Sequence, residues 1–183
     1  MYKLVAFVVL SACLIYISRA SLNKPKSHGF YRFFAWEAIL ALLLLNLEAW
    51  FSQPFSAHQI VSWCLLILCL IPLGFGVRSL TSQGKASSRR PGDDSLLAFE
   101  KTTVLVTSGI YRYIRHPLYS SLLLLAWGIF FKAPGWSGAV LALAASLLLY
   151  ATARADEAEC LRYFGEPYGD FMKHTRRFVP FLF

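Results

Sequence analysis

Charge is scarce in this chain: Asp, Glu, Lys and Arg together make up 15% of its 183 residues, against about 25% in ordinary soluble domains. So few charged side chains could not cover the surface of a soluble domain of this length. Hydrophobic residues fill 57% of the positions and aromatic residues 16%, and the mean hydropathy is +0.52. These values exclude a disordered chain, a coiled coil and a secreted disulfide scaffold, and they indicate a membrane protein with several spans.

Residues that bind metals are also few. None of the four cysteines forms a C-x-x-C pair, which argues against a zinc finger or a thiol redox motif. His28 and His58 flank apolar segments without a partner at metal-ligand spacing, and His174 lies among basic residues. We therefore expect no metal site. No basic run with interleaved aromatic residues stands clear of the apolar segments, so we expect no nucleic-acid partner either.

Five apolar segments account for the high hydropathy. Crossing about 30 Å of hydrocarbon takes about 20 helical residues, and the fourth segment is shorter than the others. The turn Lys132–Gly135 predicts that the last two segments form an antiparallel hairpin, and Pro72 predicts a kink in the third. We expect an all-α polytopic membrane protein with one domain over residues 1–183, and with transmembrane helices at about 2–18, 33–51, 58–77, 117–131 and 136–153.

The N-terminal segment has a second interpretation. Residues 10–13 resemble a bacterial lipoprotein cleavage box, with Lys3 as a charged flank. The apolar run continues beyond Cys13 to Ile17, however, which favours a membrane helix over a removed signal.

Basic residues predict the orientation of the spans. With the N-terminus outside, 16 of the 18 lysines and arginines fall in the segments 19–32, 78–116 and 154–177, all on the cytoplasmic side. Only Lys3 and Lys132 remain outside. Because positive charge favours the cytoplasmic face, we expect the C-terminus and any pocket for a water-soluble cofactor to lie there, in contact with membrane lipids.

Two acidic residues lie within the second apolar segment. Glu37 and Glu48 are eleven residues apart, which would put both on one face of a continuous helix. Intramembrane acids are functional candidates. The alternative is that both lie near the ends of the segment, paired or reaching the interface.

The most informative stretch is residues 105–119, with the sequence LVTSGIYRYIRHPLY. Gly109 permits a turn, and Pro117 suits the first turn of a helix. A second cluster, Arg154-Ala155-Asp156-Glu157, lies at the inner end of the last span, so the predicted hairpin brings both clusters to the same membrane face. Gly165 and Pro167 predict that one helix ends there and that another folds back over the clusters.

Each cluster alone has a structural explanation. The Arg-His-Pro sequence could anchor a span at the interface, and the acidic pair could form ion pairs with nearby arginines. Together, with a segment that can cover them, they favour a functional site.

The run VTSGIYRYIRHPLY, followed by DE, FGEPYGDF and RFVP, resembles the isoprenylcysteine carboxyl methyltransferase and phospholipid methyltransferase family of integral membrane enzymes. The resemblance covers about 80 residues, from Thr103 to Pro180, within a catalytic region of about 103–183. It implies an S-adenosylmethionine-dependent methyltransferase with a lipid-like or prenylated acceptor from the bilayer. It implies a catalytic pair, Arg154 and Glu157. It further implies a cofactor pocket formed by Thr103, Val104, Leu105, Val106, Tyr111, His116, Pro117, Leu118, Tyr119, Asp156 and Glu157.

Three positions depart from the family pattern. Asp156 replaces the first Glu of the acidic pair, Ser121 replaces a Gly, and Thr152 occupies the position of the substrate-binding Arg, for which Arg154 is the nearest replacement. Two other functions are compatible with the sequence. One is an NADPH-dependent membrane reductase of the sterol type, which is usually a longer protein, and the other is a non-catalytic membrane protein.

Overall fold

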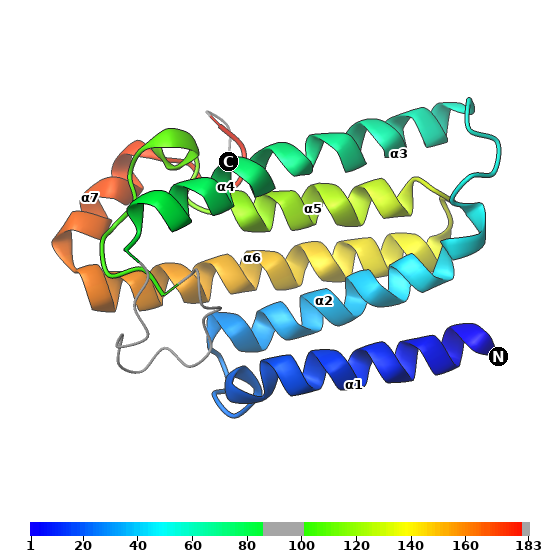
Figure 1. Cartoon of the computed structure of the whole chain (residues 1–183), viewed down its shortest axis with the longest axis horizontal. Helices are drawn as coiled ribbons and strands as arrows, with labels where there is room; N and C mark the ends of the chain where they lie inside the picture. Colours follow the sequence, from blue (N-terminus) through cyan, green and yellow to red (C-terminus); the bar gives the residue numbers. More distant parts are fainter. Residues whose placement is uncertain (86–100, 181–183) are drawn as a thin grey trace.

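The computed structural model describes residues 1–85 and 101–180, and the described residues are almost entirely helical (Figure 1). They contain no β-strand, only a single parallel bridge between Ile114 and Arg176. The helices in chain order are α1 (Tyr2–Leu22), α2 (His28–Leu45), η1 (Leu47–Ala49), α3 (Ala57–Leu68), α4 (Leu70–Gln83), η3 (Gly109–Arg112), α5 (Pro117–Phe130), α6 (Trp136–Phe164) and α7 (Glu166–His174).

Four helical stretches in the described residues are long and apolar enough to cross a membrane: α1, α2, the combined run of α3 and α4, and α6. At 1.5 Å per residue, the 14 residues of α5 extend about 21 Å. This length is below the roughly 30 Å of a hydrocarbon core, as the short fourth apolar segment predicted. The expectation of an all-α polytopic membrane protein is confirmed.

The predicted second span, 33–51, is wrong at both ends, because α2 runs from His28 to Leu45. It begins earlier because the Ser27 hydroxyl accepts a hydrogen bond from the Phe30 amide and caps the helix. It ends at Asn46, whose side-chain amide donates to the Ile129 carbonyl at 2.9 Å. Apolar composition could not locate either signal.

The proposed shared face of Glu37 and Glu48 is therefore also wrong, since Glu48 lies in η1, beyond the end of α2. Glu48 accepts a hydrogen bond from the Tyr2 hydroxyl and pairs with Lys3 at 3.1 Å. Glu37 accepts a hydrogen bond from the Ser11 hydroxyl at 2.6 Å. Both acids thus tie α1 to the segment that follows it, which agrees with the alternative of paired acids.

The third span divides into α3 and α4 at Cys69. Pro72 has no amide hydrogen to donate to the Leu68 carbonyl, so the regular hydrogen-bond pattern is interrupted there. This interruption is the expected effect of Pro72.

The hairpin of α5 and α6 is present, but α6 does not end at residue 153 as predicted. It continues to Phe164 and ends at Gly165, whose φ of +65° lies in the left-handed region. The stretch 154–164 contains neither Gly nor Pro, so nothing local stops the helix earlier. The acidic cluster is therefore in the interior of α6, and its helical phase decides which way each side chain points.

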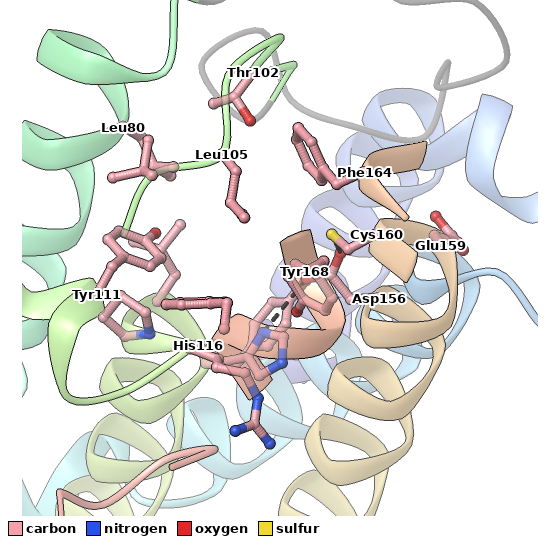
Figure 2. Close-up of a pocket in the computed structure, with 16 residues that line it drawn as sticks. Leu80, Thr102, Leu105, Tyr111, His116, Asp156, Glu159, Cys160, Phe164 and Tyr168 are labelled. Atoms are coloured by element: carbon pink, nitrogen blue, oxygen red, sulfur yellow. Dashed lines mark hydrogen bonds and ion pairs between the residues drawn. The ribbon is translucent and has the colours of Figure 1, made fainter. Parts of the chain in front are cut away.

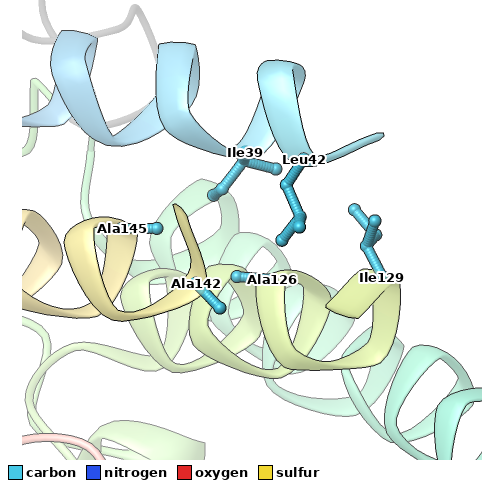
Figure 3. Packing of buried hydrophobic residues seen from close by; sticks show 6 residues of the cluster. All are labelled: Ile39, Leu42, Ala126, Ile129, Ala142 and Ala145. Carbon is cyan, nitrogen blue, oxygen red and sulfur yellow. The ribbon is translucent and has the colours of Figure 1, made fainter. Parts of the chain in front are cut away.

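The helices pack through small residues in the middle of the bundle. Figure 3 shows side chains of α2, α5 and α6 meeting there: Ile39, Leu42, Ala126, Ile129, Ala142 and Ala145. Alanines at these contacts let the helix backbones approach closely, as is typical of membrane bundles. Large apolar side chains elsewhere point outward, including Val8, Ile67 and Leu147, with exposed fractions of 59%, 62% and 70%. Such surfaces suit a lipid environment.

The two ends of the bundle differ. The N-terminus, the α2–α3 connection and the α5–α6 turn lie at one end, whereas α7, η3 and the end of α4 lie at the other (Figure 1).

Candidate functional site

A pocket of about 770 Å³, counting its open mouth, lies at the end of the bundle that carries α7 (Figure 2). The lining comes from α4, the 102–116 segment, α5, α6 and α7: Leu80, Thr102, Leu105, Val106, Tyr111, Arg115, His116, Pro117, Leu118, Tyr119, Asp156, Glu159, Cys160, Phe164, Tyr168 and Phe171.

Local sequence features place these walls. Gly109 adopts a φ of +62°, and a Cβ there would lie 2.8 Å from the Ser79 hydroxyl, so the turn into η3 packs tightly on α4. Pro117 begins α5 directly after His116. The positive φ of Gly165 reverses the chain, and α7 folds back so that Tyr168 and Phe171 line the pocket. The predicted covering helix is thus confirmed.

The structure brings together eight of the eleven residues predicted to bind a cofactor: Leu105, Val106, Tyr111, His116, Pro117, Leu118, Tyr119 and Asp156. Thr103, Val104 and Glu157 do not line the pocket. The Thr103 hydroxyl instead donates to the Lys85 carbonyl at 2.9 Å, and Val104 is exposed.

His116 lies between the two acids of the DE pair. Its Nδ1 is 3.5 Å from Asp156 Oδ2 and its Nε2 is 3.4 Å from Glu157 Oε1, and its ring stacks on Tyr119. Burial disfavours the charged ring, but the nearby carboxylates of Asp156 and Glu157 outweigh it and raise the pKa of His116 above its ordinary value of 6.5. The two carboxylates therefore favour the protonated form of the imidazole.

Asp156 is the acid nearest the middle of the pocket wall (Figure 2). Its Oδ2 accepts a hydrogen bond from the Tyr119 hydroxyl at 3.1 Å, and its Oδ1 lies 3.6 Å from Cys160 Sγ. The side chain keeps 21% of its surface exposed. A carboxylate has about four lone-pair positions, so Asp156 retains capacity for a ligand.

Glu157 has different partners. Its Oε1 accepts from Arg115 Nε at 2.9 Å and from Arg177 Nε at 3.1 Å, and its Oε2 accepts from Arg177 Nη2 at 2.8 Å. Its side chain is only 5% exposed. This arrangement matches the structural explanation considered for the acidic pair, ion pairing with nearby arginines.

The arginine pairs fasten the C-terminal segment to the site. Arg115 also donates from Nη1 to the Thr175 and Met172 carbonyls. Backbone hydrogen bonds join the same segments, from the Arg115 amide to the Arg176 carbonyl at 2.8 Å and from the Arg176 amide to the Tyr113 carbonyl at 3.0 Å. Glu157 is thus the centre of a polar junction beside the pocket.

Arg154 lies outside the pocket and is exposed. It hydrogen-bonds to the Tyr150 hydroxyl, whose ring lies 5.1 Å from the Arg177 guanidinium carbon. The structure does not bring Arg154 together with the residues that line the pocket.

Several lining residues were not predicted. Glu159 and Cys160 follow Asp156 by three and four positions, so all three share one face of a helix, whereas Glu157 is turned by about 100°. The sequence could have indicated that Asp156, Glu159 and Cys160 share a face only if α6 had been expected to continue past residue 153. Tyr168 and Phe171 come from α7, the helix that folds back over the pocket. Burial raises the pKa of the Tyr168 phenol, which stays neutral.

Within residues 1–85 and 101–180, no group of three or more His, Cys, Asp or Glu side chains is arranged to hold a metal ion. The acidic and basic side chains at the pocket are instead two carboxylates, a histidine and an arginine, set against apolar and aromatic walls.

Comparison with known proteins bears on the same region. Residues 94–165 match the phospholipid methyltransferase family. The described part of this stretch comprises η3, α5, α6 and the loops around them, which supply most of the pocket wall. The match confirms the resemblance to the phospholipid methyltransferase family over these residues and supports a membrane methyltransferase. No curated protein matches the chain, and no solved structure does so either.

Proposed function

We propose that this protein is an S-adenosylmethionine-dependent methyltransferase that acts on a lipid-like acceptor carrying an anionic nucleophile, similar to isoprenylcysteine carboxyl methyltransferases. The observation that carries the proposal is the coincidence of the pocket with the family match. Most of the described pocket wall belongs to residues 94–165.

The chemistry of the pocket fits the cofactor. Asp156 offers a carboxylate with free lone pairs to an ammonium group, and the rings of Tyr111, Phe164 and Tyr168 offer faces to an adenine or a cation. Leu105 and Leu118 supply apolar wall. Bound there, S-adenosylmethionine would supply an electrophilic methyl group.

The acceptor class follows from the small number of proton acceptors in the described pocket lining, which apart from His116 are the carboxylates of Asp156 and Glu159. A phospholipid amine must lose a proton before it can attack, whereas a carboxylate or thiolate need not. The DE pair favours the protonated form of His116, and burial raises the pKa of the Tyr168 phenol. These features favour an acceptor that arrives as an anion.

For Arg154 and Glu157, the predicted catalytic pair, we propose roles other than direct contact with the reacting atoms. Glu157 would act by holding Arg115 and His116 in place. Arg154 would meet an acceptor only outside the pocket, near Tyr150.

Transfer of a labelled methyl group tests the proposal. Purified protein in liposomes receives methyl-labelled S-adenosylmethionine with either a farnesylated cysteine bearing a free carboxylate or phosphatidylethanolamine. We expect base-labile label on the farnesylated carboxylate. Asp156→Asn should reduce it, whereas Asp170→Asn, at an exposed acid of α7 that pairs with Lys173, should not. Label on the amine alone would contradict the acceptor class, and label on neither would count against methyl transfer to these classes.

A further inference from the structure

A second carboxylate, that of Glu159, lines the pocket beside Asp156. Glu159 lies one helical turn beyond Asp156 on α6, on the side of the pocket nearer α2 (Figure 2). Residues three apart on a helix are neighbours on one face. The exposed fraction of the Glu159 side chain is 17%, similar to the 21% of Asp156 and unlike the 5% of Glu157.

Glu159 is held in place by the first residue of α2. Its Oε1 accepts from the His28 backbone amide at 3.0 Å, and its Oε2 lies 2.6 Å from His28 Nδ1. The amide is one of the donors that a helix N-terminus leaves without an intrahelical partner, and the helix dipole favours a carboxylate there. Two donors thus fix both oxygens of Glu159 in one orientation.

His28 is suited to a positioning role. Its side chain is fully buried, although the residue is 131 positions from Glu159 in sequence. Nδ1 makes the contact with Glu159, whereas Nε2 has no hydrogen-bond partner among the described residues. Among the hydrogen bonds of the described residues, the His28 ring makes only the one with Glu159.

We infer that Asp156 and Glu159, rather than Asp156 and Glu157, form the acidic pair that recognises the ammonium group of the cofactor's amino-acid portion, with His28 as the positioning residue for Glu159. The inference rests on the proposed function. Glu157 is excluded from this pair because two arginines occupy its oxygens and it does not line the pocket. Asp156 and Glu159 each keep lone pairs that their protein partners do not use.

The inference predicts a selective loss of affinity. Removing the charge of Glu159 should weaken binding of a ligand with an ammonium group about tenfold or more, because charge-assisted hydrogen bonds are the stronger ones. It should leave a ligand without that group unaffected. S-adenosylhomocysteine carries the amino-acid portion, and 5′-methylthioadenosine has the adenosine and thioether without it, so the pair of ligands isolates this contact.

Isothermal titration of the full chain in detergent with both ligands tests the inference. We expect Glu159→Gln and His28→Ala to lower the affinity for S-adenosylhomocysteine at least tenfold without changing that for methylthioadenosine. His28→Asn should restore most of the affinity, since an Asn amide can donate from nearly the position of Nδ1. Glu166→Gln, the same change at an exposed acid that begins α7, should have no effect.

Three outcomes would overturn the inference: equal weakening of both ligands by Glu159→Gln, no weakening of either, or a selective loss in Glu157→Gln instead. A His28→Asn variant as weak as His28→Ala would remove the positioning role. Failure of the unchanged protein to bind S-adenosylhomocysteine would be a different result, because it would contradict the proposed function itself and the inference with it.

Discussion

Arg177 donates two parallel hydrogen bonds to Glu157, from Nε to Oε1 at 3.1 Å and from Nη2 to Oε2 at 2.8 Å. This fork-to-fork geometry is the strong form of an arginine–carboxylate pair. It joins the segment after α7 to the C-terminal third of α6. Arg115 reaches the same carboxylate from the segment before α5, so three parts of the chain meet at one buried acid.

Arg177→Gln should destabilise the protein strongly. Glu157 would lose two charge-assisted hydrogen bonds but keep Arg115 as a partner, so we expect a loss of about 1.5–3 kcal/mol. Thermal unfolding in detergent measures the loss. Arg162→Gln, at an exposed arginine of the same helix as Glu157, should change stability by less than about 0.5 kcal/mol. Equal effects of the two substitutions would show that the Glu157 junction adds little stability.

Stability should fall as the pH rises past the ordinary titration range of histidine. The folded protein raises the pKa of His116 above 6.5, so the stability contributed by its protonation is complete below 6.5 and is lost as the pH rises through the higher folded-state pKa. Thermal unfolding of His116→Gln and the unchanged protein between about pH 6 and 9 gives the difference. We expect the stability advantage of the unchanged protein to shrink with rising pH. Parallel profiles would refute this role for His116.

Gly128 should not tolerate a larger residue. A Cβ there would lie 2.9 Å from the Leu66 side chain and 3.2 Å from the Leu66 amide nitrogen, at the contact of α3 with α5. Gly128→Ala should therefore cost about 1–3 kcal/mol. A Cβ at Gly74, in α4, would meet no neighbouring atom within 4 Å, so Gly74→Ala should be neutral or stabilising by up to about 1 kcal/mol. Thermal unfolding midpoints of the two variants in the same detergent test this prediction, and a Gly128→Ala midpoint as high as that of Gly74→Ala would contradict it.

The distribution of basic residues predicts that the pocket end of the bundle is cytoplasmic. Single cysteines at Ser52, exposed beyond η1, and at Lys173, exposed on α7, report the two ends in a protein whose four natural cysteines have been replaced. A membrane-impermeant maleimide added to sealed cells should label the first and not the second. The reverse pattern would invert the predicted topology.

Much of the fold could be predicted from local sequence signals. Pro117 and Gly165 each fix a helix boundary through backbone chemistry that does not depend on distant residues, and the turn at 132–135 fixes the hairpin. The bounds of α2 could not be predicted in this way. They depend on the Ser27 cap and on the contact of Asn46 with α5, neither of which an apolar pattern reveals.

The candidate site likewise has features that the sequence predicts and features that it does not. His116, Tyr119 and Asp156 are near one another because the hairpin brings two motifs to one end of the bundle, which the sequence predicted. The separation of Glu157 from Asp156 depends on the helical phase of a longer α6. The contact of His28 with Glu159 joins residues 131 positions apart, and no local pattern indicates such a pair.

Isothermal titration of the purified chain with S-adenosylhomocysteine and, separately, with NADPH tests the central claim most directly. We expect saturable binding of S-adenosylhomocysteine with a stoichiometry near one, its loss or weakening in Asp156→Asn, and no binding of NADPH. Binding of NADPH alone would indicate a reductase, and binding of neither ligand by folded protein would contradict a cofactor-dependent methyltransferase.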